Sequence, residues 1–154
     1  MNFHLSAITL DEASMVALSP AIAQEREVAV LDLLDANVFR LEGSDHGPYE
    51  LTLGVGDGRL VFDLRRGGED HMRIALSLAP LRTVIKDYWL VCENYYKAIR
   101  TATPQQVEAL DAGRKALHDE GATELRQRLH GKIETDFATA RRLFTLICVL
   151  QLRA

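Results

Sequence analysis

Apolar and polar residues alternate along much of the first half of the chain, with the period of two that is typical of β-strands. In residues 59–65, Leu60, Phe62 and Leu64 share one face, because successive side chains of a strand point to opposite sides. The same pattern predicts strands at residues 2–10, 38–42, 49–55, 59–65 and 71–78. The last four are joined by short connectors rich in Gly and Asp, so we expect an antiparallel meander.

A helix is predicted between the first strand and the meander. Ser19 and Pro20 are residue types preferred at the N-cap and at the first helical position. The helix is expected over residues 20–36, and Asn37 would mark its end.

The period changes after Ala79, where apolar positions recur every three or four residues. This spacing predicts a long helix over residues 80–100. A second helix is expected to begin after Thr103, whose side chain can form a capping box with Gln106. The second half of the chain is therefore predicted to be helical.

Two further signals divide this helical half. Gly121 is expected to break or bend the second helix after about Glu120, and a shorter helix would continue until Gly131. Thr135 is the expected cap of a final helix over residues 136–152. The predicted fold class is therefore α+β, with a small antiparallel sheet, one packed N-terminal helix, and a C-terminal helical half. A single domain is expected over residues 1–154, with its strand-rich half at 1–78 and its helical half at 79–154.

Composition and charge exclude several classes of protein. The chain has 47% apolar residues and a net charge of −4, which is typical of a globular domain and not of a disordered or fibrous chain. Residues 1–58 carry ten acidic and two basic residues, so a nucleic-acid surface is not expected there. RNA binding across the sheet is a weaker hypothesis than the two given below. Few aromatic residues accompany the arginines of the predicted strands: Arg40, Arg59, Arg65 and Arg73. A nucleic-acid partner is accordingly not predicted.

The sequence also predicts a compartment. The earliest basic residue is Arg26, so the N-terminus does not resemble a signal peptide. The most apolar stretch, residues 143–150, is too short to span a membrane. Cys92 and Cys148 lie 56 positions apart and form no CxxC pair, which indicates reduced thiols. We expect a cytoplasmic protein.

Sequence motifs of catalysis and metal binding are missing. There is no GxSxG elbow, no GK[ST] loop, and no HxxxH pair among the five histidines. His118 is expected to be solvated near a helix end, and Gly54 to Gly58 favour a hairpin turn over a phosphate loop. No catalytic residue, metal site or cofactor is predicted.

The most concentrated polar side chains share one face of the 80–100 helix: Arg82, Lys86, Glu93, Tyr96 and Arg100. Guanidinium, ammonium and phenol groups on one helix could hold a carboxylate or a phosphate. The alternative is a solvated face stabilised by intrahelical pairs such as Glu93 with Lys97.

The final helix is apolar on nearly all sides after Arg142, so either the fold or a partner must enclose it. If a partner or a second copy covers it, the candidate interface residues are Phe144, Ile147 and Leu150. Arg141 and Arg142 cannot both avoid the interior, so at least one is expected to pair with an acid such as Glu134.

The chain resembles an uncharacterised alphaproteobacterial protein family over nearly its whole length. The resemblance rests on these segments: Glu25-Arg26, Gly47-Pro48-Tyr49, Arg59-Leu60-Val61-Phe62-Asp63, Lys86-Asp87-Tyr88, Tyr95-Tyr96, Ala98 to Pro104, Gly131 to Glu134, and Ala140 to Leu150. The tail from Gln151 to Ala154 departs from the His-Trp ending of that family. The family has no assigned activity, so the resemblance implies a bacterial, cytoplasmic setting and no site residue.

Two hypotheses for function follow. The first is a non-enzymatic regulatory or protein-interaction module, which binds a protein partner or forms a homodimer. The second is a small-molecule binder or an enzyme that acts on an anionic metabolite through the helix face with Arg82, Lys86 and Arg100. A deep pocket beside that helix would favour the second hypothesis, and a flat surface would favour the first.

Overall fold

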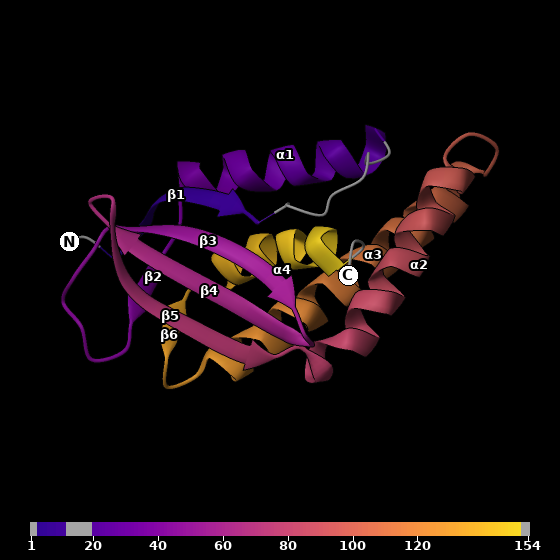
Figure 1. The fold of residues 1–154 in the computed structure, drawn as a ribbon. Coiled ribbons are helices and arrows are strands. Elements are labelled where there is room, and N and C mark those ends of the chain that lie inside the picture. Colours follow the sequence, from indigo (N-terminus) through magenta and orange to yellow (C-terminus); the bar gives the residue numbers. More distant parts are fainter. Residues whose placement is uncertain (1–2, 12–19, 152–154) are drawn as a thin grey trace.

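A computed structural model describes residues 3–11 and 20–151. It shows an α+β fold, as predicted, in which strands and the helix α1 make up the first half and helices dominate the second (Figure 1). The elements in chain order are β1 (Leu5–Leu10), α1 (Pro20–Asp35), β2 (Phe39–Leu41), β3 (Tyr49–Gly56), β4 (Arg59–Arg66), β5 (Glu69–Ser77), the 3-10 helix η1 (Ala79–Leu81), α2 (Arg82–Ala98), α3 (Pro104–Leu129), β6 (Ile133–Thr135) and α4 (Phe137–Gln151).

The main sheet has four strands in the order β1-β3-β4-β5. The predicted antiparallel meander is present as β3, β4 and β5, and Asp57 and Gly58 both have positive φ in its first turn. The first strand differs from the prediction, because β1 pairs parallel with β3. The connection between these strands contains α1, which packs against β1 and α4 and returns the chain to the end where β1 began.

A second, two-stranded sheet joins distant parts of the chain. The pattern at residues 38–42 does form a strand, but β2 pairs antiparallel with β6 and not with the meander. Phe39 lies opposite Thr135, and Leu41 lies opposite Ile133. The sequence did not predict β6, because three residues are too few to show a period.

Helix α4 lies behind the main sheet and forms the centre of the core (Figure 1). It packs against α1, α3 and β3, and every residue from Leu143 to Leu150 is buried. The fold itself therefore encloses α4, which its sequence shows to be apolar on nearly all sides.

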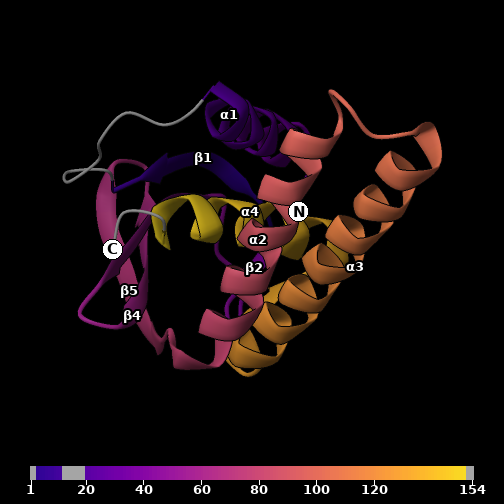
Figure 2. The ribbon, with the colours of Figure 1, turned by 90° about the vertical axis from the view of Figure 1, so that its right-hand side faces the viewer.

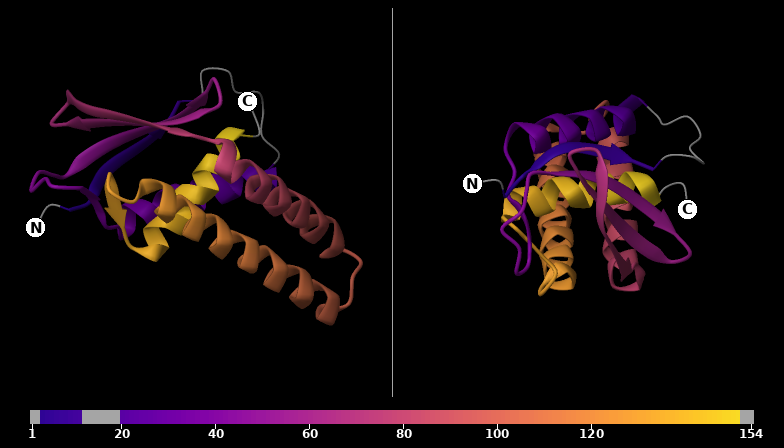
Figure 3. Two further views of the ribbon diagram at one scale, coloured as in Figure 1. Left: turned by 90° about the horizontal axis from the view of Figure 1, so that it is seen from below. Right: turned by 60° about the vertical axis from the view of Figure 1, so that its left-hand side comes forward.

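Helices α2 and α3 form a long antiparallel hairpin that extends beyond the body made by the sheet, α1 and α4 (Figures 2 and 3). The predicted capping box is present, since Thr103 Oγ1 accepts from the Gln106 N–H and Thr103 N–H donates to Gln106 Oε1. The predicted break at Gly121 was wrong, because α3 is one continuous helix through this residue. Gly121 instead permits the close approach of Phe144 from α4.

Two helix ends are held by asparagine and aspartate side chains. Asn37 follows α1 as predicted, and its amide exchanges hydrogen bonds with the backbone of Leu5 and donates to Leu33 O. At the start of α4, Asp136 Oδ1 accepts from the Thr139 N–H, so Asp136 is the cap in place of the predicted Thr135. The Ser19 cap expected for α1 lies outside the described residues.

Candidate functional site

The predicted anion-binding face of α2 does not form one site. Arg82, Lys86, Glu93 and Arg100 are exposed as expected. Because a helix rises 1.5 Å per residue, Arg82 and Arg100 are separated by about 27 Å along the axis, so one small anion cannot contact both. Tyr96 does not contribute to this exposed face, since its hydroxyl donates to the carboxylate of Glu25 in α1.

The candidate interface residues of α4 lie inside the monomer. Phe144 and Ile147 are fully buried, and Leu150 is 4% exposed. Their apolar character is explained by the chain's own α1, α3 and β3. In this structure these three side chains are not accessible to a partner, so a partner would have to bind another surface.

A polar network connects α1, α2 and α3 around Glu25. Glu25 Oε1 accepts from the Tyr96 hydroxyl at 2.7 Å and lies 3.5 Å from Nη1 of Arg114. Arg114 also binds Asp111 Oδ1 at 2.6 Å, and its guanidinium lies over the ring of Tyr95. Burial, together with the hydrogen bond to Glu25, raises the pKa of Tyr96 well above its usual range.

A second network connects α3 to α4 through His118. Nε2 of His118 lies 2.8 Å from both Arg141 O and Thr145 Oγ1, and Nδ1 lies 3.3 Å from Nη2 of Arg141. These partners fit a neutral ring that donates through Nε2 and accepts at Nδ1. Burial lowers the pKa of His118, which agrees with this neutral form. Both ring nitrogens have partners within the protein, so His118 connects α3 to α4.

Arg141 has a different partner from the one expected. Its Nε lies 2.9 Å from Oδ1 of Asp119 in α3, whereas Glu134 pairs with Arg40 at 3.3 Å. Asp119 is one residue from His118, so the ion pair and the histidine network together attach α4 to α3. The sequence could not identify this partner, because the predicted break at Gly121 left the course of α3 undefined.

A pocket of about 200 Å³ opens between α1 and α4, beside these networks. We call it the α1–α4 pocket. Each helix contributes positions i, i+3, i+4 and i+7 of one face: Glu25, Val28, Ala29 and Asp32 from α1, and Ala138, Arg141, Arg142 and Thr145 from α4. His118 of α3 completes the lining. The pocket thus combines charged groups of both signs with small apolar side chains.

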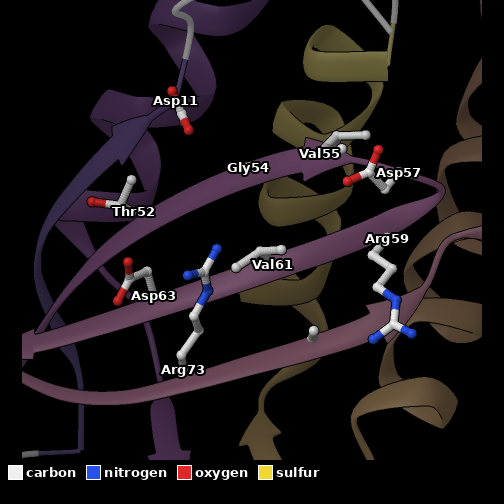
Figure 4. A pocket seen from close by; sticks show the side chains of 11 residues that line it. Asp11, Thr52, Gly54, Val55, Asp57, Arg59, Val61, Asp63 and Arg73 are labelled. Atoms are coloured by element: carbon white, nitrogen blue, oxygen red, sulfur yellow. The ribbon is translucent and has the colours of Figure 1, made fainter.

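The open face of the main sheet carries a hollow of about 410 Å³ (Figure 4). Its floor is the cross-strand row Gly54, Val61 and Ala75. In Figure 4 the guanidinium of Arg73 lies between Asp63 and Val61, and Arg59 lies near the turn that follows β3. None of its lining residues is aromatic, so the hollow does not favour the stacking of RNA bases.

The outer edge of β5 borders a groove of about 890 Å³, whose far side includes Leu41 and Lys132. Among the described residues, β4 is the only partner strand of β5. Edge strands often bind extended peptides, but Glu69, Asp70 and Arg73 give β5 the charged side chains that protect such edges from pairing.

Helix α1 presents apolar side chains to solvent on its outer side. Val28 and Leu34 are 44% and 42% exposed, and Leu31 between them is 61% exposed. Val38, just after the helix, is 43% exposed. Acidic residues accompany them on the exposed surface: Glu27, Asp32 and Asp35. We refer to these seven residues as the α1 outer face; two of them, Val28 and Asp32, lie at its edge and also line the α1–α4 pocket.

Both cysteines are free and buried. Burial raises the pKa of Cys92 to about 11 and that of Cys148 well above its usual range. Neither thiol has the lowered pKa of a nucleophilic cysteine.

Metal sites and membrane spans were also sought in the described parts of the chain. Residues 3–11 and 20–151 contain no group of three or more His, Cys, Asp or Glu side chains that could hold a metal ion. Within the same ranges, no helix has the length and apolar character that crossing a bilayer requires.

The sequence did not predict that Glu25, Arg114 and His118 belong to polar networks between the helices. Glu25 and Arg114 are ordinary helix-surface residue types, and His118 was expected to be solvated. The available signal was the position of Tyr96 on the same helical stripe as Cys92, which indicates that its hydroxyl reaches the interior.

Comparison with known proteins assigns the family. A family model described as "Uncharacterised protein family (UPF0262)" matches residues 2–153. A UPF0262 protein of Phenylobacterium zucineum is 53% identical over 149 residues, which cover 97% of this chain and 93% of the relative. A UPF0262 protein of Caulobacter vibrioides is 50% identical over 152 residues, which cover 99% of this chain and 95% of the relative. No solved structure matches the chain significantly. The chain therefore belongs to the uncharacterised bacterial family UPF0262, as the resemblance of its sequence segments implied.

Proposed function

We propose that this protein is a protein-interaction module of the bacterial cytoplasm, and that its α1 outer face binds a partner helix with an apolar face and basic flanks. The observation that carries the proposal is the row of exposed apolar side chains at Val28, Leu31, Leu34 and Val38. Single exposed apolar residues are common, but a row of them along a helix and the residues that follow it is typical of a binding surface. Burying it against an amphipathic helix removes that apolar area from water.

Charge determines the kind of partner that we propose. Arg26 is the only basic residue between Pro20 and Asp35, whereas Glu27, Asp32 and Asp35 accompany the apolar row. Two copies of this face would bring carboxylates together, which disfavours a homodimer through α1. A partner with Lys or Arg beside its apolar row would pair with these carboxylates and associate faster at low salt.

The cytoplasmic setting is supported by the two cysteines. Both are free thiols in the core, as in proteins of reducing compartments. An anionic metabolite bound by Arg82, Lys86 and Arg100 has less support, since the helix separates these side chains too widely for a single small molecule.

The test compares two substitutions of exposed leucines. Leu31→Glu alters the α1 outer face, and Leu90→Glu is a matched control on α2, where Leu90 is 50% exposed. Each tagged variant and the wild type are used to capture proteins from an alphaproteobacterial lysate. We expect one protein to be retained by the wild type and by Leu90→Glu and lost by Leu31→Glu. The purified pair should then show a Kd at least tenfold higher for Leu31→Glu, and a Kd that rises with salt.

Two results would contradict this proposal. The first is a captured partner whose Kd is the same for Leu31→Glu and Leu90→Glu. The second is a stable homodimer in sedimentation experiments that Leu31→Glu converts to a monomer, because the α1 outer face would then bind a second copy.

A further inference from the structure

The α1–α4 pocket contains one acidic and one basic side chain that form no ion pair with any described residue. Two of its four charged residues are neutralised within the protein, since Glu25 pairs with Arg114 and Arg141 pairs with Asp119. Asp32 and Arg142 line the same pocket without an ion pair to any described residue. The pocket therefore offers one free carboxylate and one free guanidinium to a ligand.

These two charges lie toward the same end of the pocket. Helices α1 and α4 are antiparallel (Figure 1), and the Val38 N–H, just after α1, donates to Thr139 Oγ1 in the first turn of α4. Asp32 in the last turn of α1 is therefore opposite the N-terminal half of α4, which contains Arg142. A ligand that binds both residues must carry its own opposite charges close together.

We infer that the α1–α4 pocket binds a small zwitterion of the amino-acid type, with its carboxylate on Arg142 and its ammonium group on Asp32. In an α-amino acid both charged groups are attached to one carbon, so one small molecule presents a carboxylate and an ammonium group to the two side chains that line this pocket. Arg142 can bind a carboxylate through two parallel N–H donors. Asp32 can accept from an ammonium group.

The size and lining of the pocket limit the ligand further. The volume of about 200 Å³ is below the range of about 300–1,000 Å³ that is typical of pockets for drug-sized ligands, so a small molecule is favoured. Val28, Ala29 and Ala138 provide a small apolar surface, and the hydroxyl of Thr145 and the ring of His118 form the polar wall. Alanine, serine, threonine and valine have the appropriate size.

The experiment is isothermal titration calorimetry at low salt on the purified protein. The probes are glycine, alanine, serine, threonine and valine, and two half-ligands, propionate and propylamine. We expect at least one amino acid to bind, and both half-ligands to bind at least tenfold more weakly, because each lacks one charge-assisted hydrogen bond.

Variants identify the residues that bind the ligand. Arg142→Gln and Asp32→Asn should each raise the Kd of that amino acid at least tenfold. Arg100→Gln and Asp87→Asn, which remove the same charges at exposed positions outside the pocket, should leave the Kd unchanged. The fluorescence of Trp89, the only tryptophan, verifies that each variant is folded.

Several outcomes would overturn the inference. One is that none of the probes binds. A double-mutant cycle in which Asp32 and Arg142 stabilise the folded state together would then show that the two side chains form a direct ion pair that closes the pocket. Another is that propionate binds as tightly as the amino acids. Asp32 also belongs to the α1 outer face, but the titration uses the isolated protein, and Leu31, which tests that face, does not line the pocket, so failure of one proposal can be distinguished from failure of the other.

Discussion

The ring of Phe144 in α4 lies against Gly121 of α3, in the space that a side chain at residue 121 would occupy. A β-carbon on Gly121 would overlap three atoms of this ring, Cζ, Cε1 and Cε2. Phe144 is fully buried and also contacts Tyr88 and His118, so it has no free space into which to move. The glycine therefore sets how closely α3 can pack against α4.

Gly121→Ala is expected to lower the free energy of unfolding by about 1–3 kcal/mol, the usual cost of overpacking a core. This loss should occur even though alanine favours a helix over glycine by about 1 kcal/mol. Urea denaturation followed by Trp89 fluorescence measures it. Adding Phe144→Leu should recover part of the loss, because the smaller side chain makes room for the new methyl group.

Gly113 of the same helix provides the matched control. A β-carbon there would meet only Cγ1 of Val91, at an ordinary contact distance of 4.0 Å. Gly113→Ala is therefore expected to stabilise the protein by about 0.5–1 kcal/mol. Equal effects of the two substitutions would show that Phe144 does not restrict residue 121.

The stability of the protein should fall as the pH drops below about 6.5, because of His118. Burial among Arg141, Thr145 and Phe144 lowers the pKa of the folded histidine from its ordinary value of 6.5. The unfolded state then binds a proton that the folded state excludes, so stability is complete above pH 6.5 and decreases below it. The loss is at most about 1.4 kcal/mol per pH unit. It ends when the pH reaches the lower pKa of the folded state.

Denaturation at pH 7.5 and 5.5 tests this dependence. His118→Gln removes the titrating group and should show a smaller difference between the two pH values than the wild type. His130→Gln, at an exposed histidine after α3, should retain the difference of the wild type. A pH dependence unchanged by His118→Gln would assign it to other groups.

The hydrogen bond from Tyr96 to Glu25 is expected to stabilise the attachment of α1 to α2. Tyr96→Phe should lower the free energy of unfolding by about 1.5–3 kcal/mol, the range for hydrogen bonds to charged groups. In a double-mutant cycle with Glu25→Gln, the two substitutions should cost less together than the sum of their separate costs. Additive costs would mean that the hydroxyl contributes nothing through Glu25.

The thiols should react only when the protein opens. A solution at pH 8 is about three pH units below the pKa of Cys92, which burial raises to about 11, so this thiol stays protonated. Cys148 is fully buried. A thiol reagent should therefore modify neither cysteine on the time scale of its reaction with a free thiol, and should modify both in denaturant. Rapid modification of the native protein would contradict the burial of these residues.

The sequence by itself predicted the elements whose signals are local. The capping box at Thr103, the hairpin turn at Asp57 and the alternation in residues 59–65 each depend on residues within a few positions of one another. Such signals determine where a helix begins or a strand turns, because the groups that satisfy the backbone are neighbours in the chain. They were also sufficient for the fold class, since the period of two in the first half and of three to four in the second differ clearly.

Only the tertiary structure decided the features that depend on distant residues. The parallel pairing of β1, the strand β6 and the course of α3 through Gly121 arise because each segment meets a partner far along the chain: Tyr49 for Leu5, Leu41 for Ile133, and Phe144 for Gly121. Arg141 likewise pairs with Asp119 and not with the nearer Glu134. A long-range contact is selected by the packing of the whole core, in which burial and hydrogen bonding must be satisfied together, and no short stretch of sequence contains that information.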